Sequence, residues 1–303
     1  MSTKYISIEE ATKRAGKDDF LQNVKKAIIP RLIKKGMLNG KKEKKNLLVA
    51  DDDALARVMQ SGVESFVQNQ QGYSFMVVRA PIETVGEKLK ARKSVAKHEP
   101  NIKPLKMKHD IGVQPDEKRR HTFLVQMRNA PHWTALIQTV HWFHSCDAIM
   151  VTALASALSK ELKTLAAAAW DDDFSGSSLI ICENGQQKGA ISEEDEGGDD
   201  EEDSWAGFYE FFYENGISLP QSFIEVDKGA ANLYVADPKQ VLRADRVELK
   251  VPKPVESKGP HVFEKLGMMA EAMAGDFDDE EAFMNHMRGG IWQQAQAVLK
   301  AGF

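Results

Sequence analysis

The middle of this sequence contains its densest group of potential metal ligands. His132, His141, His144, Cys146 and Asp147 bring three imidazoles, a thiol and a carboxylate together within sixteen residues. Zinc and other transition metals prefer imidazole and thiolate ligands, so this group is a candidate metal site. On a strand, however, His141 and His144 point to opposite faces, and no second Cys or His pair follows at a matching interval. We therefore expect structural histidines, with no bound metal and no other cofactor.

Motifs for nucleophilic catalysis and for nucleotide binding are missing from the sequence. Residues 175–178 are rich in serine but lack the Gly-x-Ser-x-Gly spacing of a nucleophile elbow, so they indicate a turn. Residues 36–41 are one residue short of a phosphate-binding loop, and no Gly-x-Gly-x-x-Gly occurs. The three aspartates at 171–173 would alternate in direction, which favours a solvated turn over a magnesium site.

The net charge of −5 conceals opposite charges in separate segments. Residues 1–45 contain 13 Lys or Arg against 5 Asp or Glu, whereas residues 171–203 contain 13 acidic residues against Lys188 alone. Such segments usually lie in solvent or attract an oppositely charged surface. Although the basic segment can neutralise phosphates, it has few arginines or aromatic residues to read bases, and the whole chain is acidic. We therefore expect that nucleic acid is not the partner.

The C-terminal segment contains apolar stripes at helical spacing that are unusually rich in methionine. Methionine is flexible and polarizable, so surfaces rich in it adapt to the shape of a partner. Packing on the chain's own core is the alternative interpretation of these stripes. The residues that we expect to bind a protein partner or a second copy are Met269, Met273, Phe283, Met287, Ile291 and Trp292.

The fold expected to position these side chains can be read from the central part of the chain. Periodicity and turn signals between residues 73 and 191 predict the order β-α-β-β-α-β, followed by an added hairpin. In this reading, residues 165–170 form a buried strand despite their alanine content, because turn residues bound the run on both sides. The order predicts an α+β fold of ferredoxin-like type, an antiparallel sheet with helices on one face.

The chain divides into three predicted parts around this fold. Residues 1–72 form a basic helical extension, in which Ser7, Asp18 or Asp19, and residues 51–53 mark helix starts. Residues 73–251 form the core domain, with a long irregular excursion at 94–114 and a disordered acidic loop at 193–203. Residues 252–303 comprise a linker and amphipathic C-terminal helices.

The expected function is binding rather than catalysis. We predict a non-enzymatic cytoplasmic protein that acts by protein–protein association, for instance a bacterial protein that sequesters a partner or takes part in an assembly. No membrane segment is expected, because no run approaches roughly 20 apolar residues, and two cysteines suit a reducing compartment. The alternative is a hydrolase with a histidine-rich, metal-dependent cleft around His132, His141 and His144.

Overall fold

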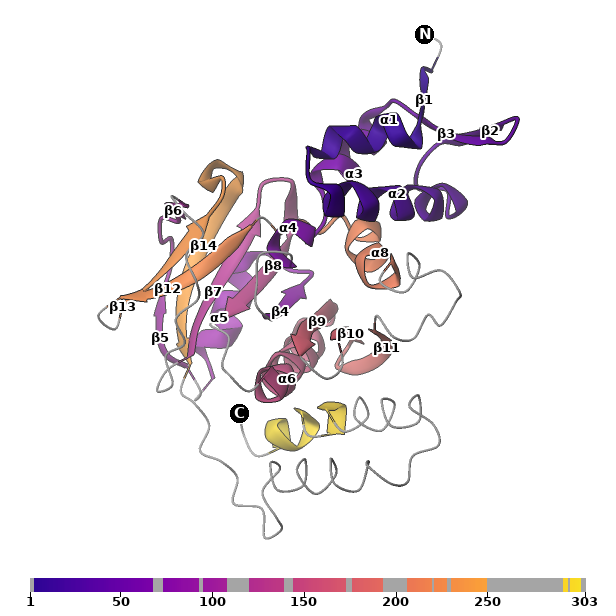
Figure 1. Cartoon of the computed structure of the whole chain (residues 1–303). Coiled ribbons are helices and arrows are strands. Elements are labelled where there is room, and N and C mark those ends of the chain that lie inside the picture. Colours follow the sequence, from indigo (N-terminus) through magenta and orange to yellow (C-terminus); the bar gives the residue numbers. More distant parts are fainter. Residues whose placement is uncertain are drawn as a thin grey trace, which may run out of the picture.

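The protein has an α+β fold built on a large antiparallel sheet, as predicted (Figure 1). The structure is a computed structural model. It describes residues 3–67, 73–92, 95–107, 120–138, 144–172, 176–192, 206–219, 221–227, 230–249, 291–293 and 295–300.

The large sheet has eight strands in the order β11-β10-β9-β4-β8-β7-β14-β5, and every neighbouring pair is antiparallel. Its strands are β4 (Tyr73–Val78), β5 (Val95–Glu99), β7 (Arg120–Met127), β8 (Ala130–Gln138), β9 (Leu165–Asp172), β10 (Gly176–Glu183), β11 (Gln186–Ser192) and β14 (Val241–Leu249). The predicted buried strand at 165–170 is confirmed as part of β9. Its alanines let a helix pack closely on the sheet.

Helices α5 (Ile82–Lys90) and α6 (His144–Leu162) cover one face of this sheet. Met76 and Val78 of β4 point into the hydrophobic cluster that lies between the sheet and these two helices. Phe75 and Val77 point to the opposite face, where a second cluster is formed with other elements. Because successive strand residues alternate between faces, β4 is apolar on both sides and lies in the interior.

The opposite face is covered as well, so the expectation that helices cover one face only was wrong. Helices α4 (Glu64–Val67) and α8 (Ala206–Glu214) place aromatic rings against the sheet, among them Phe66 and Phe212 beside Phe75. A second sheet is formed by β6 (Leu105–Lys106), β12 (Ser222–Asp227) and β13 (Ala230–Val235). Two covered faces explain why β4 is apolar at nearly every position.

The N-terminal unit, residues 3–60, lies at one end of the molecule above α8 (Figure 1). Its elements are β1 (Tyr5–Ser7), α1 (Ile8–Thr12), the 3-10 helix η1 (Lys13–Ala15), α2 (Asp19–Lys34), β2 (Gly40–Glu43), β3 (Asn46–Ala50) and α3 (Asp53–Gln60). The predicted caps are confirmed, because Ser7, Asp18 and Asp52 each accept a hydrogen bond from a backbone N–H in the following first turn. The strands, which form a sheet in the order β1-β3-β2, were not predicted.

Two further differences concern the core. The region predicted as an irregular excursion contains β5 and β6, and β14 lies inside the large sheet between β7 and β5. A 3-10 turn, η2 (Pro238–Gln240), precedes β14. The acidic segment 193–203 lies outside the described residues.

The described part of the C-terminal segment, residues 291–293 and 295–300, is helical and packs on the chain's own core. Ile291 belongs to the cluster under α6, Trp292 packs against it, and Gln296 Nε2 donates to Ser156 Oγ at 3.0 Å. For Ile291 the structure therefore shows an intramolecular contact where a partner contact was expected. Phe283, Met287, Met269 and Met273 lie outside the described residues. No described helix is long and apolar enough to span a membrane.

Candidate functional site

The histidine group predicted as a candidate metal site is only partly visible in the structure. His132 lies on β8 with an exposed side chain, and His144 and Cys146 belong to the first turn of α6. His141 lies outside the described residues, as do the surroundings of the His144 and Cys146 side chains. Within the described part of the chain, no three His, Cys, Asp or Glu residues form a group that could hold a metal ion.

The N-terminal unit contains two helices joined by a tight turn and followed by a β-hairpin. Helix α1 and the 3-10 turn η1 end at Gly16, whose φ of +119° is a backbone conformation that favours glycine. Asp18 then caps α2, so two helices are joined by a tight turn, and the β2–β3 hairpin follows. Pairing of β1 with β3 holds this hairpin next to the helices. Helix–turn–helix units with this connectivity can present their second helix to a groove.

The exposed stripe of α2 is polar and basic. Asn23, Lys26 and Lys34 recur at intervals of three and eight residues, so they lie on one side of the helix. Val24 and Ile28, on the opposite side, are fully buried in the core of the unit. Lys26 and Lys34 form no ion pair with any residue that the structure describes, so both ammonium groups are available to a ligand.

The β2–β3 hairpin concentrates further lysines in solvent. Glu43 pairs with Asn46, which leaves Lys44 and Lys45 as a two-residue turn. Lys44 has φ +56°, a left-handed conformation that costs a non-glycine residue roughly 1–2 kcal/mol. Turns of this length favour Asn, Asp or Gly, so the local backbone alone does not explain a lysine here. Lys42, like these two turn lysines, is exposed and has no carboxylate partner among the described residues.

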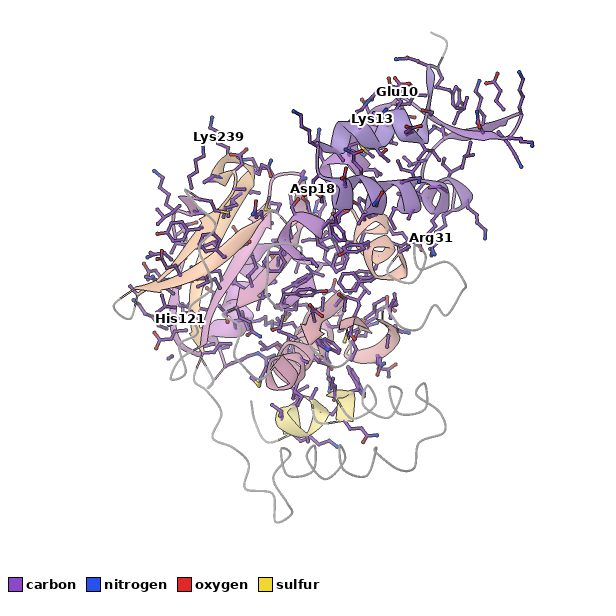
Figure 2. All side chains as sticks on the ribbon, in the orientation of Figure 1. Glu10, Lys13, Asp18, Arg31, His121 and Lys239 are labelled. Atoms are coloured by element: carbon purple, nitrogen blue, oxygen red, sulfur yellow. The ribbon has the colours of Figure 1, made fainter. Side chains whose placement is uncertain are left out.

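Acidic residues of α8 neutralise the basic residues that face the core. Arg31 Nη1 lies 3.2 Å from Glu210 Oε2, and Lys35 Nζ lies 2.7 Å from Glu210 Oε1. Lys35 also forms an ion pair with Glu214, and hydrogen bonding to the two carboxylates raises the pKa of Lys35. These contacts attach α2 to α8. Figure 2 shows Arg31 at this junction and Lys13 on the outer side of the unit.

A third lysine of α2 is buried between the N-terminal unit and the rest of the chain. Lys25 is 4% exposed, and its Nζ donates to the carbonyl oxygens of Val58 (3.0 Å) and Ser61 (2.6 Å) and to the hydroxyl of Tyr213. Glu64, which is 3% exposed, lies 3.7 Å away from Nζ. Burial lowers the pKa of Lys25 and raises the pKa of Glu64, because a charge is poorly solvated there. Each partner opposes the shift of the other.

Gly62 fits closely against this buried group. Its φ is +114°, and a Cβ at this position would lie 2.0 Å from Glu64 Oε2 and 2.6 Å from the Tyr213 hydroxyl. A glycine is therefore required both by the backbone and by the space that the carboxyl group occupies. The other carboxyl oxygen, Glu64 Oε1, accepts no hydrogen bond in the structure.

Above Glu64 there is a cavity of about 470 Å³ at the junction of the N-terminal unit and the sheet. We call it the junction cavity. Its lining includes Lys25 and Glu64, together with Arg128 from the β7–β8 turn and Lys239 from η2. The remaining lining residues are Ala15, Leu21, Met59, Gln60, Ser61, Gly62, Ser65, Asn129, Ser218, Leu219 and Gln240. Sequence reasoning missed this site, although a lysine within the apolar stripe of α2 was a visible signal.

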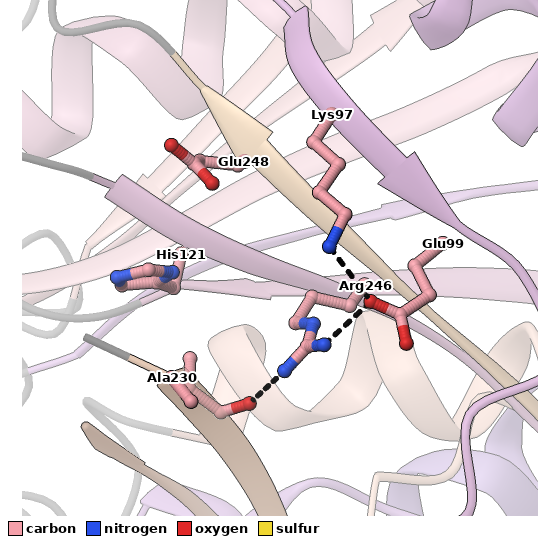
Figure 3. A pocket seen from close by; sticks show the side chains of 7 residues that line it. Lys97, Glu99, His121, Ala230, Arg246 and Glu248 are labelled. Carbon is pink, nitrogen blue, oxygen red and sulfur yellow. Dashed lines mark hydrogen bonds and ion pairs between the residues drawn. The ribbon is translucent and has the colours of Figure 1, made fainter. Parts of the chain in front are cut away.

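A smaller cavity of about 290 Å³ lies where β5 and β14 pass the end of β13 (Figure 3). Arg246 donates from Nη1 to the carbonyl oxygen of Ala231 and from Nη2 to Glu99 Oε2, at 2.6 and 2.5 Å. Lys97 also pairs with Glu99 at 3.4 Å, and the hydrogen bond from Arg246 lowers the pKa of this carboxyl group. These charged groups pair with one another, and the hydrogen bond from Arg246 to Ala231 joins the two sheets. The cavity therefore offers little to a ligand.

Comparison with known proteins gives no match: no protein-family model, no curated protein and no solved structure is similar to this chain.

Proposed function

We propose that this protein is a non-enzymatic binding protein whose N-terminal unit associates with double-stranded nucleic acid, with duplex DNA as the partner. The supporting observation is the β2–β3 hairpin, where Lys42, Lys44 and Lys45 are exposed and unpaired among the described residues. The class of function is the one expected from the sequence, but the partner differs from the protein partner predicted there.

The argument begins with the distribution of positive charge. The basic residues of α2 that face α8 are neutralised by Glu210 and Glu214, whereas Lys26 and Lys34 on the outer stripe are not. The charge that remains therefore lies on an exposed helix and on the hairpin that follows it. Groups of this kind bind the phosphate backbone, since they displace the counterions condensed on it.

The shape of the unit favours a duplex over a single strand. A second helix of a helix–turn–helix pair fits the major groove of DNA, and a basic hairpin beside it can contact the adjoining backbone. Single-strand binding uses aromatic side chains on which bases stack. The outer stripe of α2 has no aromatic residue. Asn23, on the same stripe, has the amide that can pair with an adenine edge.

The test is fluorescence anisotropy with a labelled duplex of about 24 base pairs, titrated with the full chain at several salt concentrations. Each phosphate contact contributes about 0.9 to the slope of log K against log salt. Removing three contacts in the variant Lys42→Gln/Lys44→Gln/Lys45→Gln should therefore lower the slope by about 2.7. Over a fourfold rise in salt this difference corresponds to about a 40-fold change in affinity.

The matched control changes three exposed lysines on the opposite side of the sheet, Lys88→Gln/Lys90→Gln/Lys163→Gln. It removes the same charge and should leave the slope of the parent unchanged. Equal loss in both variants, or no duplex binding by the parent at 50 mM salt, would refute the proposal. Stronger binding to single strands or to RNA than to duplex DNA would also refute it.

Three expectations from the sequence remain proposals: a ferredoxin-like strand order, a cytoplasmic location, and association through the C-terminal helices. We propose that β9, β4, β8 and β7 form a ferredoxin-like unit, to which β10 and β11 are added at one edge and β14 and β5 at the other. Cys182 is an unpaired thiol, which suits a reducing, cytoplasmic location. Self-association or binding of a protein through the C-terminal helices is tested separately by variants of Met287 and Ile291.

A further inference from the structure

Five exposed lysines of the N-terminal unit form no ion pair with a residue that the structure describes. We call them the lysine group: Lys26 and Lys34 on the outer stripe of α2, and Lys42, Lys44 and Lys45 on the hairpin. The hairpin begins against the end of α2, because a Cβ at Gly40 would lie 2.5 Å from Ile33 Cγ2. The lysine group therefore belongs to one continuous part of the unit.

The most acidic segment of the chain is attached beside this unit. Residues 193–203 contain nine Asp or Glu, two Gly and no Lys or Arg. Two residues connect the segment to Ala206, the first residue of α8, and α8 packs against α2 (Figure 1). In the first turn of α8, Tyr209 contacts Phe20 of α2 edge to face, with ring centroids 6.2 Å apart. The chain therefore leads from the acidic segment directly to the helix that carries Lys26 and Lys34.

The length of this connection allows the acidic segment to reach the outer stripe of α2. An extended chain spans about 3.4 Å per residue, so Gly198, in the middle of the segment, can lie up to about 27 Å from Ala206. A helix with its side chains is only about 10–12 Å across. Strand β11, which ends at Ser192 just before the segment, also contacts α8. Both ends of the segment are thus held near α2, which gives its carboxylates a high effective concentration there.

The contacts of α8 show the chemistry that such an approach continues. Glu210 lies 3.2 Å from Arg31 and 2.7 Å from Lys35, so α8 neutralises the cations on one side of α2. The lysine group remains on the part of the unit that these carboxylates do not pair with. An extended acidic chain carries about one charge per 3.4 Å, which is also the spacing of phosphates along one strand of DNA. The acidic segment therefore matches the charge pattern of the partner that we propose for this surface.

We propose that residues 193–203 bind the lysine group of their own chain and compete there with duplex DNA. The competition rests on the proposed function, whereas the contact between the two segments does not. Exposed ion pairs are screened over about 8 Å at physiological salt, so the contact should weaken as the salt concentration rises.

Carbodiimide cross-linking of the full chain tests the contact in the absence of DNA. The reagent joins a lysine amine to a carboxylate that touches it, and mass spectrometry of the digest identifies the pair. At 50 mM salt we expect links between residues 193–203 and the lysine group, and at 500 mM salt at least fivefold fewer. Lys88 and Lys90, which are exposed on α5, are the matched controls and should form no link to this segment.

A mixture of isotope-labelled and unlabelled chains distinguishes the chain's own segment from that of a second copy. The proposal requires links within one chain. Links found only between chains would overturn it, because the occupant would then be a second copy. The absence of links to the lysine group at 50 mM salt, or equal linking of Lys88 and Lys90, would overturn it as well.

Anisotropy with the labelled duplex tests the competition. Glu201→Gln/Glu202→Gln/Asp203→Asn should raise duplex affinity about fivefold at 50 mM salt, because apparent affinity is proportional to the fraction of chains whose surface is free. The matched control, Glu83→Gln/Glu87→Gln/Glu183→Gln, removes the same charge from exposed positions on α5 and β10 and should change affinity less than twofold. Equal gains in both variants, or no gain in the first, would overturn the competition. If the parent binds no duplex, the proposed function fails, and the cross-links alone decide this inference.

Discussion

Replacing Lys25 with methionine should destabilise the protein far more than replacing its neighbour on the helix. The change keeps the length of the side chain but removes the ammonium group that donates to Val58, Ser61 and Tyr213. It also leaves Glu64 buried without its cation. Removing one partner of a buried ion pair costs about 3–5 kcal/mol, so we expect a loss of that size in the free energy of unfolding at pH 8. Lys26→Met, at an exposed position, should cost less than about 0.5 kcal/mol.

The pH dependence of Lys25→Met identifies the cause of the loss. Glu64 alone in this site has a folded-state pKa above its unfolded value of about 4.3, so the folded state binds the proton more tightly. The penalty is present above the folded pKa and decreases as pH falls through it. The stability of the variant should therefore move toward that of the parent as pH falls toward the unfolded pKa of Glu64, and Lys25→Met/Glu64→Gln should lack this trend.

Urea unfolding followed by tryptophan fluorescence provides the measurement, since Trp133 and Trp170 are both buried. The four proteins of the cycle are the parent, Lys25→Met, Glu64→Gln and Lys25→Met/Glu64→Gln. Each is measured at pH 5 and at pH 8. A Lys25→Met variant within 1 kcal/mol of the parent at pH 8 would refute the reasoning. It would mean that Glu64 is neutral, or solvated, where the structure places it beside a lysine.

Two other predictions follow from burial. Desolvation raises the pKa of Cys182 to about 12. In a Cys146→Ser background, the native protein should therefore resist Ellman's reagent at pH 8 and react once it is unfolded in urea. Labelling of the native protein within minutes would contradict this prediction. Ile291→Asp should lower the melting temperature because Ile291 is in the core. Met287→Asp should instead reduce the mass measured by light scattering, with little change in the melting temperature. A reversed result would assign Met287 to the core and Ile291 to an interface.

Local signals in the sequence predicted those parts of the fold that short-range chemistry determines. Ser7, Asp18 and Asp52 cap helices where side-chain oxygens precede an amphipathic run. The hairpin turn at Asn184 and Gly185, both with positive φ, was likewise readable from the residue types that favour such backbone angles. Each of these features depends on contacts within a few residues.

Features that depend on distant pairing were not predictable in this way. Strand β5 pairs with β14 through residues such as Glu99 and Arg246, which are 147 positions apart. Strand β2 is exposed at every position, so it lacks the alternation of apolar and polar residues by which strands are recognised. The pairing of Lys25 with Glu64 required knowledge of how α2 and α4 pack. The junction cavity required still more, since its walls come from five separate segments of the chain.

The basic residues of the N-terminal segment include three populations with different roles. Arg31 and Lys35 are consumed by ion pairs with α8, and Lys25 is buried beside Glu64. The third population, the outer stripe of α2 with Lys42, Lys44 and Lys45 of the hairpin, forms no ion pair with a described residue. A count of charges treats these residues as equivalent, and the acidic net charge was one of the two reasons why the sequence alone argued against nucleic acid. In the structure, Glu210 and Glu214 of α8 neutralise the cations that attach the unit, and Asp51 neutralises Arg14 within it. Changes to the first two populations should therefore alter stability, and changes to the third should alter duplex binding alone.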